Sequence, residues 1–207
     1  ELAETIALEA SEILMRYFRG DYSVDTKADE EPVTEADRAA NEHIVARLQE
    51  LFPDDGILAE ESADPAAIVG KQRVWMVDPM DGTKEFTLGV PEFVVSVAYV
   101  REGQAVIGVL YNPITEELFS GIVGQGAWYN GQPTTVTSHP EINGARVVCS
   151  RTENKKGWFD PWKEQLNLLP VGSVAYKVRV ERTEQRPRLQ DQTRIPPRRR
   201  LDSARPA

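Results

Sequence analysis

Acidic residues gather at three separate points along the chain, each where a predicted helix or strand begins or ends. In chain order they are Asp37, Glu60, Glu61, Asp78 and Asp81. Hard divalent cations such as Mg2+ are held by carboxylate and carbonyl oxygens, and they usually share their coordination with substrate phosphate. The residue types therefore predict a divalent-cation site, provided that the fold brings the three points together.

The hexapeptide DPMDGT, which begins at Asp78, contains most of what such a site needs. Pro79 fixes one backbone torsion, and a turn here would let Asp78 and Asp81 face the same point with the Met80 carbonyl between them. Gly82 permits close backbone approach, and the amides from Gly82 onward could hold phosphate oxygens. Two metal ions about 3.5 to 4 Å apart could then activate a water and stabilise the leaving oxygen of an in-line displacement.

Each acid also has an ordinary structural explanation. Thr34 is a candidate N-cap, and Asp37 three residues later could simply complete a capping box. Glu60 and Glu61 could be a solvated pair, and Asp-Pro and Asp-Gly are common turn dipeptides. Lys84 and Glu85 could likewise be surface charges, so only the combination of acids favours a metal site.

Hydrophobic periodicity predicts the elements that must position these acids. Apolar spacing close to 3.6 residues predicts helices over residues 2–20 and 34–52, separated by a polar loop. Short strands are predicted at residues 56–61, 73–78, 93–113, 117–123 and 126–137, with turns at 101–104 and at Asn130-Gly131. An antiparallel meander is expected there, followed by a strand at 145–150, a helix around 157–169 and the first turns of a further helix at 171–178.

Composition narrows the class of protein. The 207-residue chain has a formal net charge of -9 and is long enough for one sizeable core. It shows no apolar run of the roughly 20 residues that a membrane span needs and no signal-peptide pattern, so a cytoplasmic location is expected. Its one cysteine, Cys149, lies in the apolar run ARVVCS and is expected to be a buried thiol rather than a nucleophile. Neither His43 nor His139 is needed for the predicted chemistry.

The last 29 residues differ in character from the rest. Residues 179–207 carry nine Arg and four acids, are rich in Pro and show no apolar period, so a disordered tail is expected. We interpret residues 1–178 as one domain and the tail as an altered gene end, such as a frameshift product. The arginine run at 198–200 could instead contact nucleic acid, but the absence of interleaved aromatics and of a folded motif disfavours this.

Three motifs in order, PVTEAD, AEES and DPMDGT, resemble those of the Mg2+-dependent, lithium-sensitive phosphatases. That family includes inositol monophosphatase, fructose-1,6-bisphosphatase and 3'(2'),5'-bisphosphate nucleotidase. The similarity runs from about residue 2 to residue 178 and includes GVLYNP, GQGAWYNG and VGSVA. It implies an α+β fold with α-β-α-β-α layers, two or three Mg2+ ions, inhibition by Li+, a small phosphate ester as substrate and, as is common in the family, a homodimer.

The resemblance also implies roles for particular residues. Metal ligands would be Glu60, Asp78 and the Met80 carbonyl for the first ion, with Asp78 and Asp81 for the second. The attacking water would be oriented by Asp37 and Thr83, and the Gly82 and Thr83 amides would bind phosphate. Glu61 would lie just outside the ligands, and Gly172 and Ser173 would contact the non-phosphate part of the substrate.

The chain departs from the family after residue 178. Family members continue into a WD-x-A-A-G motif whose aspartate completes the second metal site, and no acid after Lys177 follows a Trp here. The sequence thus predicts a Mg2+-dependent phosphomonoesterase, with adenosine 3',5'-bisphosphate or an inositol monophosphate as substrate. The alternative is an inactive, truncated remnant with a partial metal site.

Overall fold

The structure, a computed structural model, describes residues 1–18, 20, 22–26, 32–62, 64–136 and 141–180. The α-helices are α1 (Leu2–Phe18), α2 (Glu35–Leu51), α3 (Thr83–Thr87), α4 (Arg151–Lys155) and α5 (Val174–Val180). Three short 3-10 helices are η1 (Glu60–Ser62), η2 (Pro65–Ile68) and η3 (Asp160–Trp162). Of the expected tail, 179–207, the residues Arg179 and Val180 are the last two of α5, so the expectation of disorder was wrong for them. Residues 181–207, and His139, lie outside the described residues.

Eleven strands in the described residues form three sheets. The first strands are β1 (Val24–Thr26), β2 (Pro32–Thr34), β3 (Gly56–Ala59), β4 (Arg73–Asp81) and β5 (Val94–Arg101). They are followed by β6 (Gln104–Asn112), β7 (Glu117–Ile122), β8 (Gly126–Tyr129), β9 (Gln132–Thr134), β10 (Arg146–Cys149) and β11 (Asn167–Pro170). The largest sheet has the order β3-β4-β5-β6-β7-β8-β9, and the others are the pairs β1-β2 and β10-β11.

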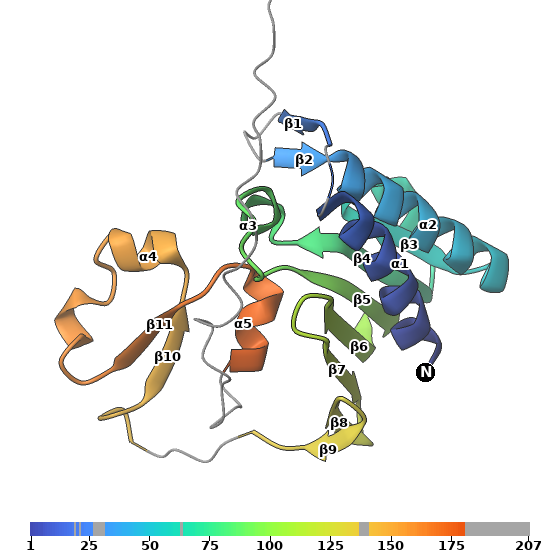
Figure 1. Cartoon of the computed structure of the whole chain (residues 1–207). Coiled ribbons are helices and arrows are strands. Elements are labelled where there is room, and N and C mark those ends of the chain that lie inside the picture. The colour runs from blue at the N-terminus through green and yellow to red at the C-terminus, as the bar shows by residue number, and fades with distance from the viewer. Residues whose placement is uncertain (19, 21, 27–31, 63, 137–140, 181–207) are drawn as a thin grey trace, which may run out of the picture.

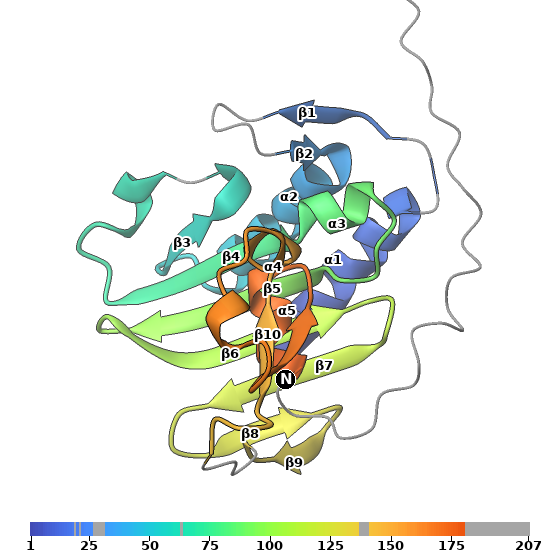
Figure 2. The ribbon, with the colours of Figure 1, turned by 90° about the vertical axis from the view of Figure 1, so that its left-hand side faces the viewer.

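The elements are stacked in layers (Figure 1). The helices α1 and α2 lie on one face of the seven-stranded sheet, and α5 lies on the other face, with the β10-β11 pair beyond it. A quarter turn of the molecule shows α5 and β10 in front of the sheet and α1 behind it (Figure 2). This succession gives α-β-α-β of the expected layers, and α4 with η3 connects β10 to β11.

The predicted meander is confirmed. All neighbouring strands from β4 to β9 pair antiparallel, whereas β3 pairs parallel with β4. The β5-β6 hairpin turns through Glu102 (φ 53°) and Gly103 (φ 78°), and the β8-β9 hairpin turns through Asn130 (φ 46°) and Gly131 (φ 75°). Two successive residues with positive φ match the twist of the strands that they join.

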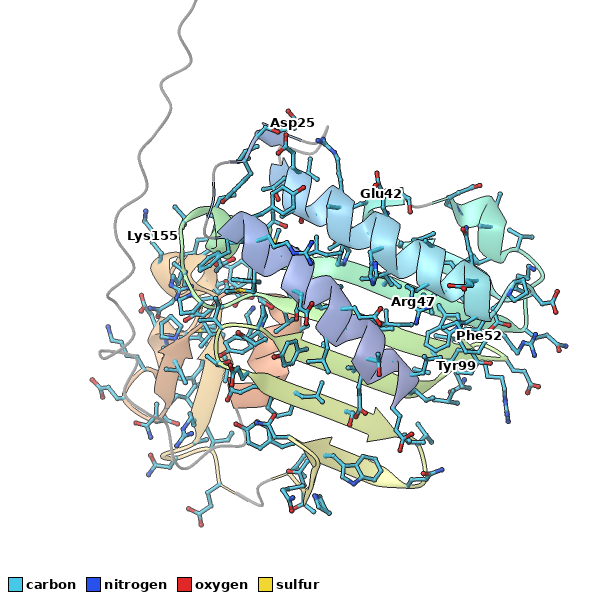
Figure 3. The ribbon with its side chains drawn as sticks, turned by 45° about the vertical axis from the view of Figure 1, so that its right-hand side comes forward. Asp25, Glu42, Arg47, Phe52, Tyr99 and Lys155 are labelled. Atoms are coloured by element: carbon cyan, nitrogen blue, oxygen red, sulfur yellow. The ribbon has the colours of Figure 1, made fainter. Side chains whose placement is uncertain are left out.

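The main core lies between the α1-α2 pair and the sheet. Buried positions of α1 include Ile6 and Leu14, and those of α2 include Ile44 and Leu48, all 0% exposed. These positions recur at helical spacing, which confirms the two amphipathic helices. A polar bridge also joins the helices: Arg47 of α2 points toward α1 (Figure 3), where its Nε lies 3.3 Å from Glu9 Oε2.

Two predictions of local structure were wrong. The helix expected around 157–169 is a series of turns with the short helix η3, followed by the strand β11. Pro161 and Gly157 disfavour a continuous helix, and Leu168 and Leu169 pair in parallel with β10 instead. The polar loop after α1 also contains a strand, because β1 pairs with β2.

Candidate active site

The first part of the candidate site is the N-terminus of α2. Thr34 is the N-cap, and its hydroxyl accepts hydrogen bonds from the amides of Ala36 and Asp37 at 3.2 and 3.3 Å. Asp37 Oδ2 in turn accepts from the Thr34 amide at 2.7 Å and from its hydroxyl at 2.6 Å. The predicted capping box is therefore confirmed. It is compatible with a second role, because only one oxygen of Asp37 is used in it.

The other oxygen of Asp37 faces the segment after β4. The Thr83 hydroxyl lies 3.0 Å from Asp37 Oδ1 and 3.2 Å from the Met80 carbonyl. A hydroxyl has one proton, and donation to a carboxylate is the stronger hydrogen bond. Asp37 is 1% exposed, and this burial raises the pKa of its carboxyl above the ordinary value. The structure thus brings Asp37, Met80 and Thr83 together, although Asp37 and Thr83 lie 46 positions apart in sequence.

A bulge in β4 decides where Asp78 and Asp81 point. Asp78 pairs with Ser96 and Asp81 pairs with Val94, so three steps along β4 match two steps along β5. In a regular strand, residues three apart face opposite sides of the sheet, and one extra residue brings them to the same side. The sequence prediction placed a turn here. The structure replaces the turn with a bulged strand end that has the same consequence.

Glu60, at the start of η1, contributes a third carboxylate to this edge. Burial first, and then the negative charges of Glu60 and Asp81, raise the pKa of Asp78 to about 8. A hydrogen bond between Asp78 and Glu60 raises the pKa further, while the Met80 amide, which donates to Asp78 Oδ1 at 3.0 Å, opposes the shift. Carboxylates that repel one another in this way fit a divalent cation, whose charge would relieve the repulsion.

The described carboxylates do not by themselves form a complete metal-binding site. Within the part of the chain that the structure describes, no three His, Cys, Asp or Glu residues are placed so that they could hold one metal ion. One oxygen of Asp81 is already bound within the chain, since its Oδ2 accepts from the Ser173 hydroxyl at 2.6 Å and from the Ala175 amide at 2.5 Å. The donor set therefore matches Mg2+ in chemistry, and α5 occupies one of its oxygens.

The predicted substrate residues Gly172 and Ser173 lie beside Asp81. Ser173 has a left-handed backbone (φ 57°), and its hydroxyl accepts from the Tyr176 amide at 3.0 Å. It thus caps α5 while donating to Asp81. The contact spans 92 residues of sequence and shows that this loop reaches Asp81.

Gly82 is required by its surroundings. Its φ is 107°, and a Cβ there would lie 2.7 Å from the Glu92 carbonyl oxygen. The residue marks the junction of β4 and α3, where the Phe86 amide donates to the Gly82 carbonyl at 2.9 Å. Any side chain at this position would push the Asp81–Thr83 segment away from the carboxylate edge.

Sequence reasoning missed three residues near Gly172. Arg151 Nη2 lies 2.6 Å from Glu92 Oε2, and the same oxygen accepts from the Gly172 amide at 2.6 Å. Arg151 Nη1 lies 3.5 Å from Glu85 Oε1. Burial raises the pKa of Glu85, which is not the simple surface charge that the sequence suggested. The one available signal was a lone Glu92 directly before the apolar run FVVSVA.

The surroundings of Cys149 and His43 indicate structural roles for both. Cys149 is 1% exposed and free, and burial raises the pKa of its thiol, which agrees with a structural role. His43 Nε2 lies 2.8 Å from Glu9 Oε2 on the outer helical layer. Among the described residues, no helix has both the length and the apolar character to cross a membrane.

A pocket of about 580 Å³ lies elsewhere in the molecule. Its walls include Leu2 of α1, Trp75 of β4 and Trp128 of β8, together with Phe52 and Tyr99 (Figure 3). None of the predicted site residues lines it. We therefore place the chemistry at the carboxylate edge, where the titratable groups and the close backbone approach coincide.

Comparisons with known proteins identify relatives of this chain. A sequence profile of the Inositol monophosphatase family matches residues 1–179. A histidinol-phosphatase of Chlorobaculum parvum is 38% identical over 154 residues, which are 74% of this chain and 59% of that protein. Inositol monophosphatase 3 of Solanum lycopersicum is 34% identical over 181 residues, covering 86% of this chain and 66% of the relative.

Solved structures show the same architecture. The IMPase of Thermotoga maritima superposes with a TM-score of 0.77 at 27% identity, covering 85% of this chain and 69% of that one. The chain spans 59% and 66% of the lengths of the two curated relatives. The match of the profile over most of the chain, together with the shared fold, shows that this protein belongs to the inositol monophosphatase family.

Proposed function

We propose that the protein is a Mg2+-dependent phosphomonoesterase that hydrolyses a small phosphorylated metabolite with a metal-activated water. The observation that carries this proposal is the bulge in β4, which directs Asp78 and Asp81 to one side of the sheet, where both charges act together with Glu60. Membership of a family whose relatives include a histidinol-phosphatase and an inositol monophosphatase supports it.

The residues present indicate how Mg2+ would be held. Glu60, Asp78 and the Met80 carbonyl would bind one ion, and Asp78 and Asp81 would bind a second, with a third ion allowed by the family pattern. When bound, Mg2+ lowers the pKa of a coordinated water and neutralises charge on the phosphate oxygens. Li+ is the expected inhibitor.

The chain's own groups would orient the water and the phosphate. The Thr83 hydroxyl donates a hydrogen bond to Asp37, so its lone pairs can accept a hydrogen bond, and then a proton, from a water. Asp37, whose pKa is raised by burial, is suited to receive that proton through Thr83. The Gly82 and Thr83 amides would bind phosphate oxygens, and no covalent enzyme intermediate is required.

The substrate would lie between the carboxylate edge and the start of α5. Gly172 and Ser173 would contact its non-phosphate part. Lys84, in DGTKEF, favours adenosine 3',5'-bisphosphate over an inositol monophosphate. The histidinol-phosphatase relative adds histidinol phosphate to the compounds to be tested. A homodimer and a cytoplasmic location stay predictions, as does a domain boundary at residue 178.

The second candidate function is an inactive remnant that retains part of the metal site. The observation in its favour is that the described acids do not close around an ion. In this interpretation the aspartate that the family pattern expects after residue 178 is necessary for activity, and residues 179–207 do not replace it.

Phosphate release separates the two candidates. The 207-residue chain and a version whose residues 179–207 are replaced by the C-terminal segment of a family member are assayed with Mg2+ and with EDTA. The substrates are adenosine 3',5'-bisphosphate, inositol 1-phosphate and histidinol phosphate. We expect the completed version to hydrolyse one of them with Mg2+, and the chain itself to be much slower.

The Asp78→Asn variant of each version is the control for a contaminating phosphatase. Rapid Mg2+-dependent hydrolysis by the 207-residue chain would contradict the remnant hypothesis. Failure of both versions with every substrate would contradict the enzyme assignment.

A further inference from the structure

The buried carboxylate of Glu92 joins the two halves of the molecule. Glu92 lies between α3 and β5 and is 6% exposed, and its Oε2 is 2.6 Å from both Arg151 Nη2 and the Gly172 amide. Arg151 begins α4 after β10, and Gly172 follows β11. A carboxylate with so little exposure needs such partners, because a buried charge without them is strongly disfavoured.

The position of Gly172 is restricted on its other side as well. A Cβ at Gly172 would collide with the Glu85 side chain, so the backbone packs directly against that carboxylate. Arg151 lies close to Glu85 and Glu92 at once, at 3.5 and 2.6 Å. The backbone at Gly172 is therefore held between two acids that one guanidinium keeps in place. Below, "the clamp" means Glu92 with Arg151.

The next residue along the chain is the one that contacts Asp81. Ser173 adopts a left-handed backbone, which costs a non-glycine residue free energy and persists only where its neighbours enforce it. From this conformation its hydroxyl donates to Asp81 Oδ2, and the Ala175 amide donates to the same oxygen. A shift of Gly172 would move both donors together.

We propose that Glu92 and Arg151 are positioning residues: by holding the Gly172 amide, they fix the start of α5 and thereby the orientation of the Asp81 carboxylate. The inference rests on the proposed function, in which Asp81 binds the second Mg2+. Neither clamp residue touches the metal or the reacting phosphate in this scheme. The Glu92 carboxylate accepts hydrogen bonds from Arg151, 59 residues later in the sequence, and from the Gly172 amide, 80 residues later.

The test uses the full chain, the completed version, and the variants Glu92→Gln and Arg151→Lys in each. Hydrogen exchange of the Gly172 and Ala175 amides is measured by NMR in the full chain, and the Mg2+ concentration for half-maximal phosphate release is measured in the completed version. We expect both amides to exchange at least about tenfold faster in Glu92→Gln, with a smaller change in Arg151→Lys. The half-maximal Mg2+ concentration should rise roughly tenfold, as is typical when a group that orients a metal ligand is changed, while the rate at saturating Mg2+ changes less.

The matched control is Arg47→Lys, which alters another Arg–Glu pair on the outer helices, with Nε 3.3 Å from Glu9. It should change neither the two amides nor the Mg2+ dependence. Exchange in Glu92→Gln equal to that in the control would overturn the clamp. Faster exchange with an unchanged Mg2+ requirement would overturn the positioning role, because the pair would then only hold the fold together.

The proposed function and the clamp fail separately. If no version releases phosphate, the proposed function is wrong. The clamp is then decided by amide exchange and by Mg2+ binding in calorimetry, where an unchanged affinity in Glu92→Gln overturns it and a weakened one supports it.

Discussion

At the scale of single residues, the acids of the site differ in the groups that surround them. The groups that shift the pKa of Asp78 are its burial, Glu60, Asp81 and the Met80 amide, and none of them is a cation. Asp37 differs, because its carboxylate is held by hydrogen bonds from Thr34 and Thr83. In the proposed mechanism the two acids therefore have different tasks: Asp78 would bind a cation, and Asp37 would accept a proton.

The stability of the metal-free protein should fall as pH rises through the titration of Asp78. The native-state pKa of about 8 lies above the ordinary value of 3.8, so the native state binds the proton more tightly than the unfolded state does. Stability from this group is complete below about pH 4 and is lost as pH rises toward 8. Mg2+ should reverse the loss, since it binds the deprotonated carboxylates.

Differential scanning fluorimetry in EDTA and in Mg2+, at pH 5, 7 and 9, measures this effect. We expect Mg2+ to raise Tm by on the order of 5 °C at pH 9 and by little at pH 5, and Asp78→Asn to remove the difference. The exposed Asp54→Asn serves as control. A Mg2+ effect that is equal at pH 5 and pH 9 would contradict the assignment of Asp78 as a ligand.

At the scale of elements, the decisive feature is the junction of β4 with α3. The bulge sets the direction of Asp78 and Asp81, and Gly82 then turns the chain into α3 with a left-handed backbone. The same few residues also pack against Glu92 through the Gly82 position. The backbone geometry of this junction therefore sets the relative positions of Asp78 and Asp81. A change in the backbone here should also move these two acids.

Replacing Gly82 with alanine should cost more stability than the same change at another left-handed glycine. Gly103 has a φ of 78° with nothing within 4 Å of a Cβ, so Gly103→Ala should cost only the backbone term of about 1 kcal/mol. Gly82→Ala adds the collision with the Glu92 carbonyl and should cost about 3 kcal/mol. Urea unfolding followed by circular dichroism gives both free energies, and equal costs would show that the collision is relieved by movement of the loop.

At the scale of the whole molecule, the seven-stranded sheet and the β10-β11 pair are stabilised unequally. Among the described residues, the main core contains nineteen buried hydrophobic residues, whereas the cluster beneath β10, β11 and α5 contains three, Val94, Val171 and Tyr176. Regions with few buried apolar contacts open at lower free energy than the global unfolding transition. We therefore expect the segment that contains Ser173 and Ala175, which contact Asp81, to open at lower free energy than the rest of the described fold.

Cys149, on β10, should report this difference. It is buried, and its raised pKa keeps the thiolate population low, so labelling requires local opening. We expect a thiol reagent to modify Cys149 at urea concentrations below the midpoint seen by circular dichroism. Labelling that coincides with that midpoint would mean that the seven-stranded sheet and the β10-β11 pair unfold as one unit.

Much of the fold follows from local sequence patterns. The amphipathic helices, the capping box at Thr34 and the hairpin at Asn130-Gly131 are confirmed, because each depends on contacts within a few residues. The strand β11 could not be predicted in the same way. Its residues form a strand only because β10 offers a parallel partner, and that pairing joins positions about twenty residues apart.

The sequence by itself determined the family and the acids that we propose for the site, because the hexapeptide beginning at Asp78 and each upstream motif consist of consecutive residues. Only the tertiary structure decided how the acids point. The bulge depends on the register with β5, the Asp81 contact depends on Ser173 92 residues away, and the clamp depends on Arg151 meeting Glu92. Such contacts are set by packing between distant segments, which the spacing of residues along the chain does not specify.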